Sequence, residues 1–110
     1  WSIRVLKMID SLLSAGKVTE AMTAENLNTS VRNLQRKLAE ESTSFGEIYE
    51  NLRREKACQY LAVPRLTLNE IAYLLGFSEP ANFTRAFKRW FSVTPTHYRK
   101  TLVSKRQSAL

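Results

Sequence analysis

Two short stretches of the chain carry side chains that can recognise hydrogen-bonding groups. The first holds Arg32, Gln35 and Arg36, which share one face of a helix, and the second holds Asn82 and Arg85. An arginine can bind the O6 and N7 of guanine with two hydrogen bonds, and a glutamine or an asparagine can bind adenine in the same way. Side chains of these types have the hydrogen-bonding groups that contacts with the base edges of DNA require.

Catalytic chemistry has little support in the sequence. His97 is the only histidine and Cys58 the only cysteine, and they lie far apart in the chain. They suggest neither a nucleophile–base pair nor a zinc site, and the sequence has no glycine-rich phosphate loop. We therefore expect no enzymatic activity, no cofactor and no metal. Cys58 lies in an apolar stretch, where a lone cysteine is most often a small core residue.

The charge favours a polyanionic partner. Seventeen Lys and Arg against ten Asp and Glu give a net charge of +7, and residues 57–110 hold eight basic residues but only two acidic ones. A basic surface that neutralises phosphates releases counterions, which drives binding to nucleic acid. A second interpretation stays open, in which a helical adaptor uses its basic face to bind an acidic protein partner.

The sequence predicts a cytoplasmic protein without a membrane partner. No apolar run approaches the roughly 18 residues that a membrane-spanning helix needs. A single cysteine fits a reducing compartment. The chain starts with Trp1 rather than Met, so we expect it to be part of a longer protein.

The elements that would position these side chains are all helical. Helices are predicted from near the start to Gly16, over 19–27, from Ser30, over 44–62, after Thr67, after Ser78 and from residue 94. Ser, Thr and Asp at such starts cap the free N–H groups of the first turn. A stripe of Phe83, Phe87, Trp90 and Phe91 predicts an amphipathic helix, and its aromatic residues, with Phe77 and Tyr98, are expected in the core. The tail, residues 104–110, is expected to be loose.

A weak internal repeat divides the chain. Ala24, Leu27 and Asn28 have the spacing of Ala72, Leu75 and Gly76, and the apolar positions of the next helix also match. Each copy reads as a short helix, a turn and a longer helix, the arrangement of a helix-turn-helix. We expect a first unit (residues 1–43), a linker helix (44–62) and a second unit (63–110).

The second unit resembles the DNA-binding domain of AraC/XylS-type transcription regulators. The resemblance rests on the pattern I-A-x-x-L-G-F-S-x-x-x-x-F-x-R-A-F-K-R-x-F-x-x-T-P-x-x-Y-R, which begins at Ile71 and ends at Arg99. In the first unit it rests on S-V-R from Ser30 and L-Q-R-K-L from Leu34, and the linker helix adds Phe45, Arg53 and Ala57. Two positions depart from the family's pattern: Ser92 replaces a usual glycine, and Thr23 a usual aliphatic residue.

The resemblance implies an all-α fold of seven helices, in which two helix-turn-helix subdomains are joined by the long linker helix. It implies sequence-specific binding of double-stranded DNA, with two recognition helices in successive major grooves. Base-reading positions are then Arg32, Gln35, Arg36, Pro80, Ala81, Asn82 and Arg85. Phosphate contacts, which position the protein without conveying sequence, are then Lys37, Thr84, Lys88, Arg89 and His97.

Some side chains have competing interpretations. Arg36 and Arg85 could instead pair with Glu40 and Glu79, and His97 could be a surface or helix-start residue. Arg53 and Arg54 could contact phosphate, but pairing with Glu50 and Glu47 inside the linker helix is favoured. Regulators of this family usually carry a separate effector or dimerisation domain, which we expect before Trp1. The resemblance also implies RNA polymerase as a partner. The sequence leaves open whether the protein activates or represses.

Overall fold

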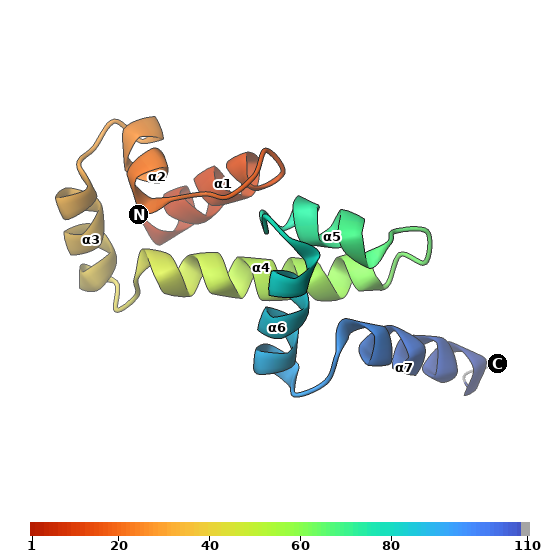
Figure 1. Ribbon diagram of the computed structural model, residues 1–110. Helices are drawn as coiled ribbons and strands as arrows, with labels where there is room; N and C mark the ends of the chain where they lie inside the picture. The colour runs from red at the N-terminus through yellow and green to blue at the C-terminus, as the bar shows by residue number, and fades with distance from the viewer. Residues whose placement is uncertain (109–110) are drawn as a thin grey trace.

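The computed structural model describes residues 1–108, with the side chains of residues 1–103. Those residues form seven α-helices and no strand: α1 (Ser2–Leu13), α2 (Glu20–Asn26), α3 (Val31–Glu40), α4 (Phe45–Leu61), α5 (Leu68–Leu74), α6 (Pro80–Phe91) and α7 (Pro95–Ser108). The long helix α4 runs through the middle of the molecule, with α1–α3 toward one end and α5–α7 toward the other (Figure 1). The predicted all-α class is confirmed.

Most of the predicted helix starts are confirmed by their caps. The hydroxyl groups of Thr19, Ser30, Ser44 and Thr67 each accept a hydrogen bond from a backbone N–H of the first helical turn. Each such cap satisfies one of the four free N–H groups at a helix start and contributes about 1 kcal/mol. The predicted Ser78 cap is wrong. Glu79 is the N-cap of α6, without a side-chain hydrogen bond, because Pro80 takes the first helical position directly after it.

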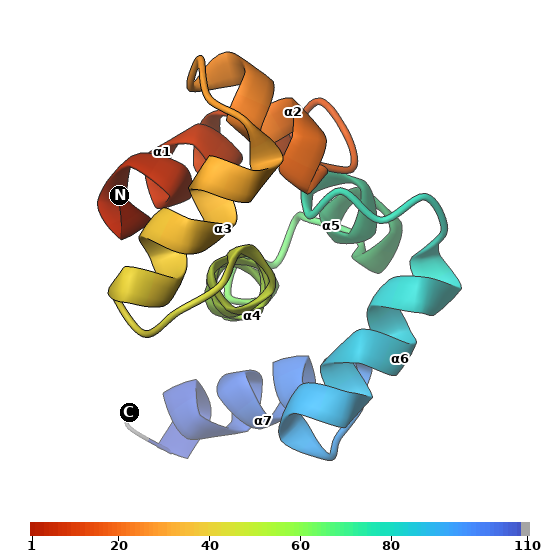
Figure 2. The same ribbon diagram turned by 90° about the vertical axis from the view of Figure 1, so that its left-hand side faces the viewer.

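Two apolar clusters form the core, and α4 belongs to both. Ile48 and Leu52 in its first half pack with buried residues of α1 and α3, whereas Ala57 and Leu61 in its second half pack with buried residues of α5 and α6. Figure 2 looks along α4 and shows the other helices arranged around it. Each large apolar side chain that is buried in this way stabilises the fold by about 1.5–3 kcal/mol. The shared helix thus joins two small cores into one molecule.

The predicted repeat is visible in the two turns between helices. Ala24 and Ala72 are both buried at the helix crossings, with 2% and 0% of their surface exposed. Asn28 and Gly76 follow with left-handed backbones, at φ 55° and φ 81°. Asparagine and glycine are the residues that adopt this conformation most readily. The same local chemistry therefore builds both turns.

Ser92 and Thr23, the two departures from the family's pattern, keep the geometry expected of the usual residues. Ser92 ends α6 in the left-handed region at φ 62°, where a side chain is strained. Thr23 is fully buried, and its hydroxyl donates to the carbonyl oxygen of Thr19 at 3.0 Å. Its polar group is therefore satisfied inside the first core.

Two other expectations are wrong in part. Phe91 was expected in the core but is 36% exposed. Phe87, on the preceding turn, takes the buried position, and the Phe91 ring packs outside it with the two ring centres 4.7 Å apart. The tail was expected to be loose from residue 104, but α7 continues to Ser108, and residues 109–110 lie outside the described part. Within the described residues, none of the helices has both the length and the apolar character to cross a membrane.

Candidate nucleic-acid interface

The helices α3 and α6 are each held by one apolar face. Leu34 and Leu38 attach α3 to the first core, and Phe83 and Phe87 attach α6 to the second; all four side chains are 0% exposed. These positions lie four residues apart in each helix and so share a face. The polar side chains of both helices are therefore left on the solvent side.

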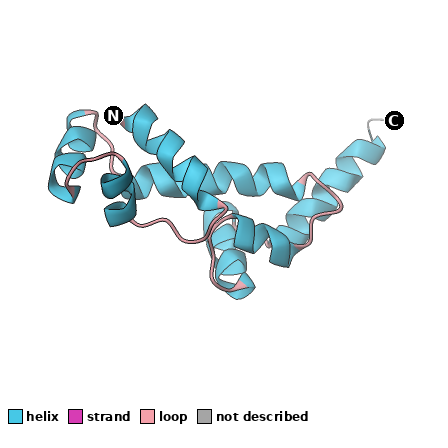
Figure 3. Cartoon of the chain, turned by 90° about the horizontal axis from the view of Figure 1, so that it is seen from above, coloured by secondary structure: helices cyan, strands magenta, loops and turns pink. Residues whose placement is uncertain are grey.

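The helices α3 and α6 run in the same direction. In Figure 1 both run downward, α3 beside the start of α4 and α6 below its middle, and in Figure 2, turned by 90°, both run from upper right to lower left. Since two perpendicular views agree, the two helices are roughly parallel and start on the same side of the molecule. Figure 3 shows the elongated arrangement from above, and the molecule measures 50 × 26 × 21 Å.

Helix α3 exposes the predicted reading residues of the first unit. Arg32, Gln35 and Arg36 are all exposed, and a shallow hollow at the start of the helix is lined by Arg32, Asn33, Arg36 and Ser30. Arg36 donates a hydrogen bond to Oδ1 of Asn33 at 2.6 Å, and Gln35 donates to Glu20 of α2 at 3.1 Å. Lys37 is half-buried.

Helix α6 presents the corresponding residues of the second unit. Ala81 and Arg85 are exposed, and Pro80 and Asn82 are half-buried at the start of the helix. Arg85 donates a hydrogen bond to Oδ1 of Asn82. Thr84 and Lys88 are exposed on the same helix, and the Thr84 hydroxyl donates to the carbonyl oxygen of Pro80 at 3.4 Å.

The two helices therefore carry matching asparagine–arginine pairs. In each, the arginine donates to the asparagine three residues earlier, and in the first Asn33 also donates to Thr29 at 2.8 Å. The Asn33 side chain was missed as a site residue, although the spacing N-x-x-R is visible in both stretches of the sequence. Among the described residues, Arg36 forms no ion pair with Glu40, and Arg85 forms none with Glu79.

Arg89 faces the linker helix instead of standing free on α6. It forms an ion pair with Glu50 of α4 at 3.0 Å, and Trp90 donates its indole N–H to the same carboxylate. Burial raises the pKa of Glu50, but the hydrogen bonds from Trp90 and Arg89 outweigh it and hold that pKa below its ordinary value. His97 is exposed at the start of α7, and its backbone N–H donates to the Thr94 hydroxyl at 3.1 Å.

The predicted pairing of Arg53 and Arg54 with glutamates inside α4 is wrong. The Arg53 guanidinium lies 4.4 Å from the centre of the Tyr49 ring and 4.2 Å from that of Phe77. Glu50 attracts Arg53 electrostatically but forms its ion pair with Arg89 of α6. Cation–aromatic contacts of this kind contribute about 0.5–2 kcal/mol. Arg54 donates to Oδ1 of Asn51, one turn earlier.

Comparison with known proteins identifies several relatives. A family model described as a helix-turn-helix domain matches residues 23–101. The chain is 41% identical over 98 residues to the HTH-type transcriptional regulator VirS of Mycobacterium tuberculosis, covering 89% of this chain and 29% of that protein. It is 42% identical over 77 residues to the ornithine utilization regulator of Pseudomonas aeruginosa, covering 70% and 23%. The chain thus spans less than a third of the curated relatives it matches.

Solved structures have the same fold. A DNA-binding transcriptional dual regulator from Escherichia coli K-12 superposes with a TM-score of 0.85 at 25% identity, covering 94% of this chain and 92% of that one. The C-terminal domain of AraT, a response regulator from Geobacillus stearothermophilus, gives 0.81 at 33% identity, covering 91% and 84%. The DNA-binding domain of the transcriptional factor AdpA, in complex with a target DNA, gives 0.80 at 18% identity, covering 96% of each, which is a likeness of fold.

Proposed function

The chain belongs to the AraC-type helix-turn-helix domains, which bind DNA in transcription regulators, and we propose that it reads two blocks of sequence in successive major grooves. The first unit reads one block with Arg32, Gln35 and Arg36 of α3. The second unit reads the other with Asn82 and Arg85 of α6. Pro80 and Ala81 add apolar contacts, for example to a thymine methyl group, since neither side chain can donate a hydrogen bond.

The parallel course of α3 and α6 is the observation that carries this proposal. Both helices start on the same side (Figures 1 and 2), and each carries an asparagine–arginine pair at the same position of the helix, with the arginine exposed. Successive major grooves on one face of DNA repeat every 34–36 Å or so. The long dimension of the molecule is 50 Å, which leaves room for two recognition helices at that separation.

The surrounding polar side chains position the domain on the DNA backbone. We assign phosphate contacts to Lys37, Thr84, Lys88, Arg89 and His97, which are exposed or half-buried. Such contacts set register and affinity without conveying sequence. Because Arg89 forms an ion pair with Glu50, it can contact phosphate only if the guanidinium binds both groups or releases Glu50.

The remaining parts of the proposal concern the whole protein. The domain limits are 1–43, 44–62 and 63–110, and an effector or dimerisation domain precedes them, since the relatives are much longer than this chain. RNA polymerase is the protein partner and the cytoplasm the compartment, as for regulators of this family.

A selection from random duplex DNA tests the proposal. The wild-type domain is incubated with a random pool, and the bound fraction is amplified and sequenced over several rounds. We expect two short blocks about one helical turn (roughly 10 base pairs) apart. Binding that weakens with salt but enriches no motif would contradict the proposal and favour the alternative, a basic adaptor for an acidic protein partner.

A further inference from the structure

We propose that Arg53 is a positioning residue that fixes the two recognition helices relative to each other, so that the domain accepts one spacing between its two DNA blocks. This inference rests on the function proposed above and deepens it. It concerns a residue outside both recognition helices.

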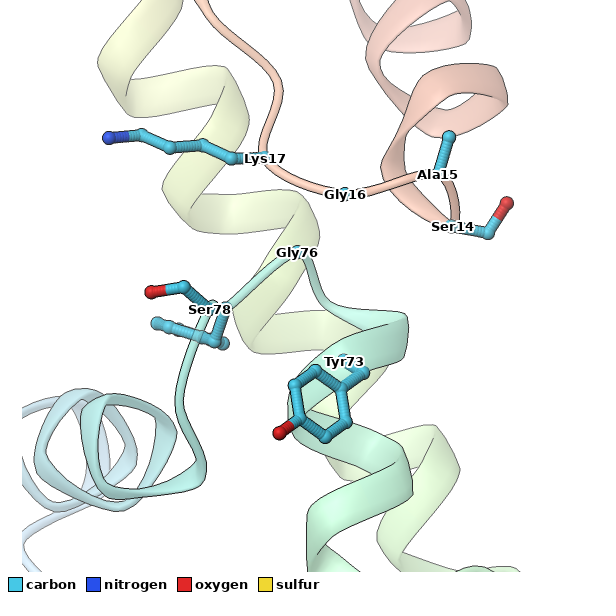
Figure 4. Close-up of a pocket in the computed structure, with 8 residues that line it drawn as sticks. Ser14, Ala15, Gly16, Lys17, Tyr73, Gly76 and Ser78 are labelled. Carbon is cyan, nitrogen blue, oxygen red and sulfur yellow. The ribbon is translucent and has the colours of Figure 1, made fainter.

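The two units meet where the α1–α2 loop lies on the α5–α6 turn. Figure 4 shows Gly16 of the loop beside Gly76 of the turn, with α4 behind them. A Cβ atom at Gly76 would lie 2.8 Å from the carbonyl oxygen of Gly16 and 3.3 Å from Cδ1 of Leu13, whose side chain belongs to the first core. Backbone therefore approaches backbone here, and the contact requires a residue without a side chain at position 76.

Arg53 links the same loop and turn through two aromatic rings. Tyr49 packs against the first core, and its hydroxyl accepts a hydrogen bond from the backbone N–H of Val18, in the α1–α2 loop, at 3.4 Å. Phe77 lies in the α5–α6 turn and packs at 5.8 Å from Phe83, which anchors α6. The Arg53 guanidinium contacts both Tyr49 and Phe77.

These contacts hold the Arg53 side chain in place. Its Nε atom is buried and has no hydrogen-bond partner among the described residues, so the two rings and the nearby Glu50 carboxylate determine where the guanidinium lies. Burial lowers the pKa of Arg53, yet the ordinary pKa of an arginine is so far above neutrality that the group stays charged. A planar cation stacks on aromatic faces in a way that neither lysine nor an aliphatic side chain reproduces.

A fixed relation between the units has a direct consequence for binding. Two reading helices that are already placed correctly bind as one rigid body and lose little freedom when the second block is engaged. If the contact loosens, the native spacing loses part of this advantage. DNA with an altered spacing is then tolerated better, because the units can shift to meet it.

The test compares Arg53→Met with the matched variant Arg54→Met, which changes the neighbouring arginine of the same helix. Affinities are measured for the selected DNA, for the same DNA with one base pair added or removed between the blocks, and for one block alone. For Arg53→Met we expect the preference for the native spacing to fall about tenfold, with single-block affinity unchanged. Arg54→Met is expected to keep the wild-type preference.

Two results would overturn the inference. One is a folded Arg53→Met protein with the wild-type spacing preference; the other is equal weakening toward every DNA, which would make Arg53 a phosphate contact. Circular dichroism checks the fold. If Arg53→Met does not fold, Arg53→Lys replaces it. A wild-type spacing preference in Arg53→Lys would also overturn the inference. A wild-type domain without any spacing preference would instead contradict the two-block function itself.

Discussion

Glu50 of α4 accepts hydrogen bonds from Trp90 and, at 3.0 Å, from Arg89, two neighbouring residues of α6. One carboxylate thus ties the end of the second recognition helix to the linker helix. Trp90 also packs at 6.5 Å from Phe87, which is buried in the second core. A charged group, the Glu50 carboxylate, is therefore one of the contacts that attach α6 to α4.

We predict that Glu50→Gln makes stability less sensitive to acid. The pKa of Glu50 is lowered in the folded state, so the unfolded chain binds more protons as the pH falls. The stabilisation is present above the ordinary pKa of 4.5 and is lost as the pH falls through the lowered value. Urea unfolding between about pH 3 and pH 6 should show a shallower loss of stability for Glu50→Gln. Glu55→Gln, at an exposed position of the same helix, is the control and should keep the wild-type curve.

Arg36→Ala and Arg85→Ala should each weaken specific binding by about 1–3 kcal/mol and relax the preference in a different block. Each change removes an exposed arginine of a recognition helix, and with it the hydrogen bonds that this arginine is proposed to donate to a base. Repeating the selection with each variant measures the effect. Arg54→Ala is the control, because Arg54 forms the same pair with an asparagine three residues earlier, but on α4. If both variants relaxed the sequence preference in the same block, the assignment of one block to each helix would be contradicted.

Lys88→Ala should weaken binding to all DNA sequences to a similar extent. Lys88 is exposed on α6, and a phosphate contact releases counterions whatever the sequence. The slope of log affinity against log salt should decrease in magnitude by about 1. Lys7→Ala, an exposed lysine of α1, should leave the slope unchanged. If Lys88→Ala changes sequence preference while the slope stays constant, Lys88 reads bases instead.

Ser92→Gly should stabilise the domain by about 1 kcal/mol. Ser92 ends α6 at φ 62°, a conformation that strains a serine but not a glycine. Thermal or urea unfolding measures the change. Ser14→Gly provides the contrast, because Ser14 ends α1 at φ −68°, where glycine only adds freedom to the unfolded chain. We expect Ser14→Gly to be neutral or destabilising, and equal gains at both sites would refute the explanation from backbone strain.

Features that depend on neighbours in the chain were predictable from the sequence. Thr19, Ser30, Ser44 and Thr67 cap helices where expected, because a cap joins atoms only a few residues apart. The apolar stripes of α3 and α6 were likewise predictable from helical periodicity. The exception was Ser78, where a proline two residues later moved the cap to Glu79.

Partner choice among charged side chains was not predictable in this way. Glu50 and Arg53 lie three residues apart in α4, so local spacing favoured a pair between them. In the folded protein, Glu50 is engaged by Trp90 and Arg53 by Phe77, both from the second unit. Partly buried contacts of this kind outweigh an exposed pair within one helix, which is worth only a few tenths of a kcal/mol.

The sequence by itself determined where the helices begin, which faces are apolar and which family the chain resembles, since each of these depends on residue types at short spacing. Only the tertiary structure decided that α3 and α6 run parallel, that Gly16 meets Gly76, and that Arg53 lies between two aromatic rings. These relations join segments far apart in the chain. They depend on how the two cores pack on α4, and no local pattern encodes that packing.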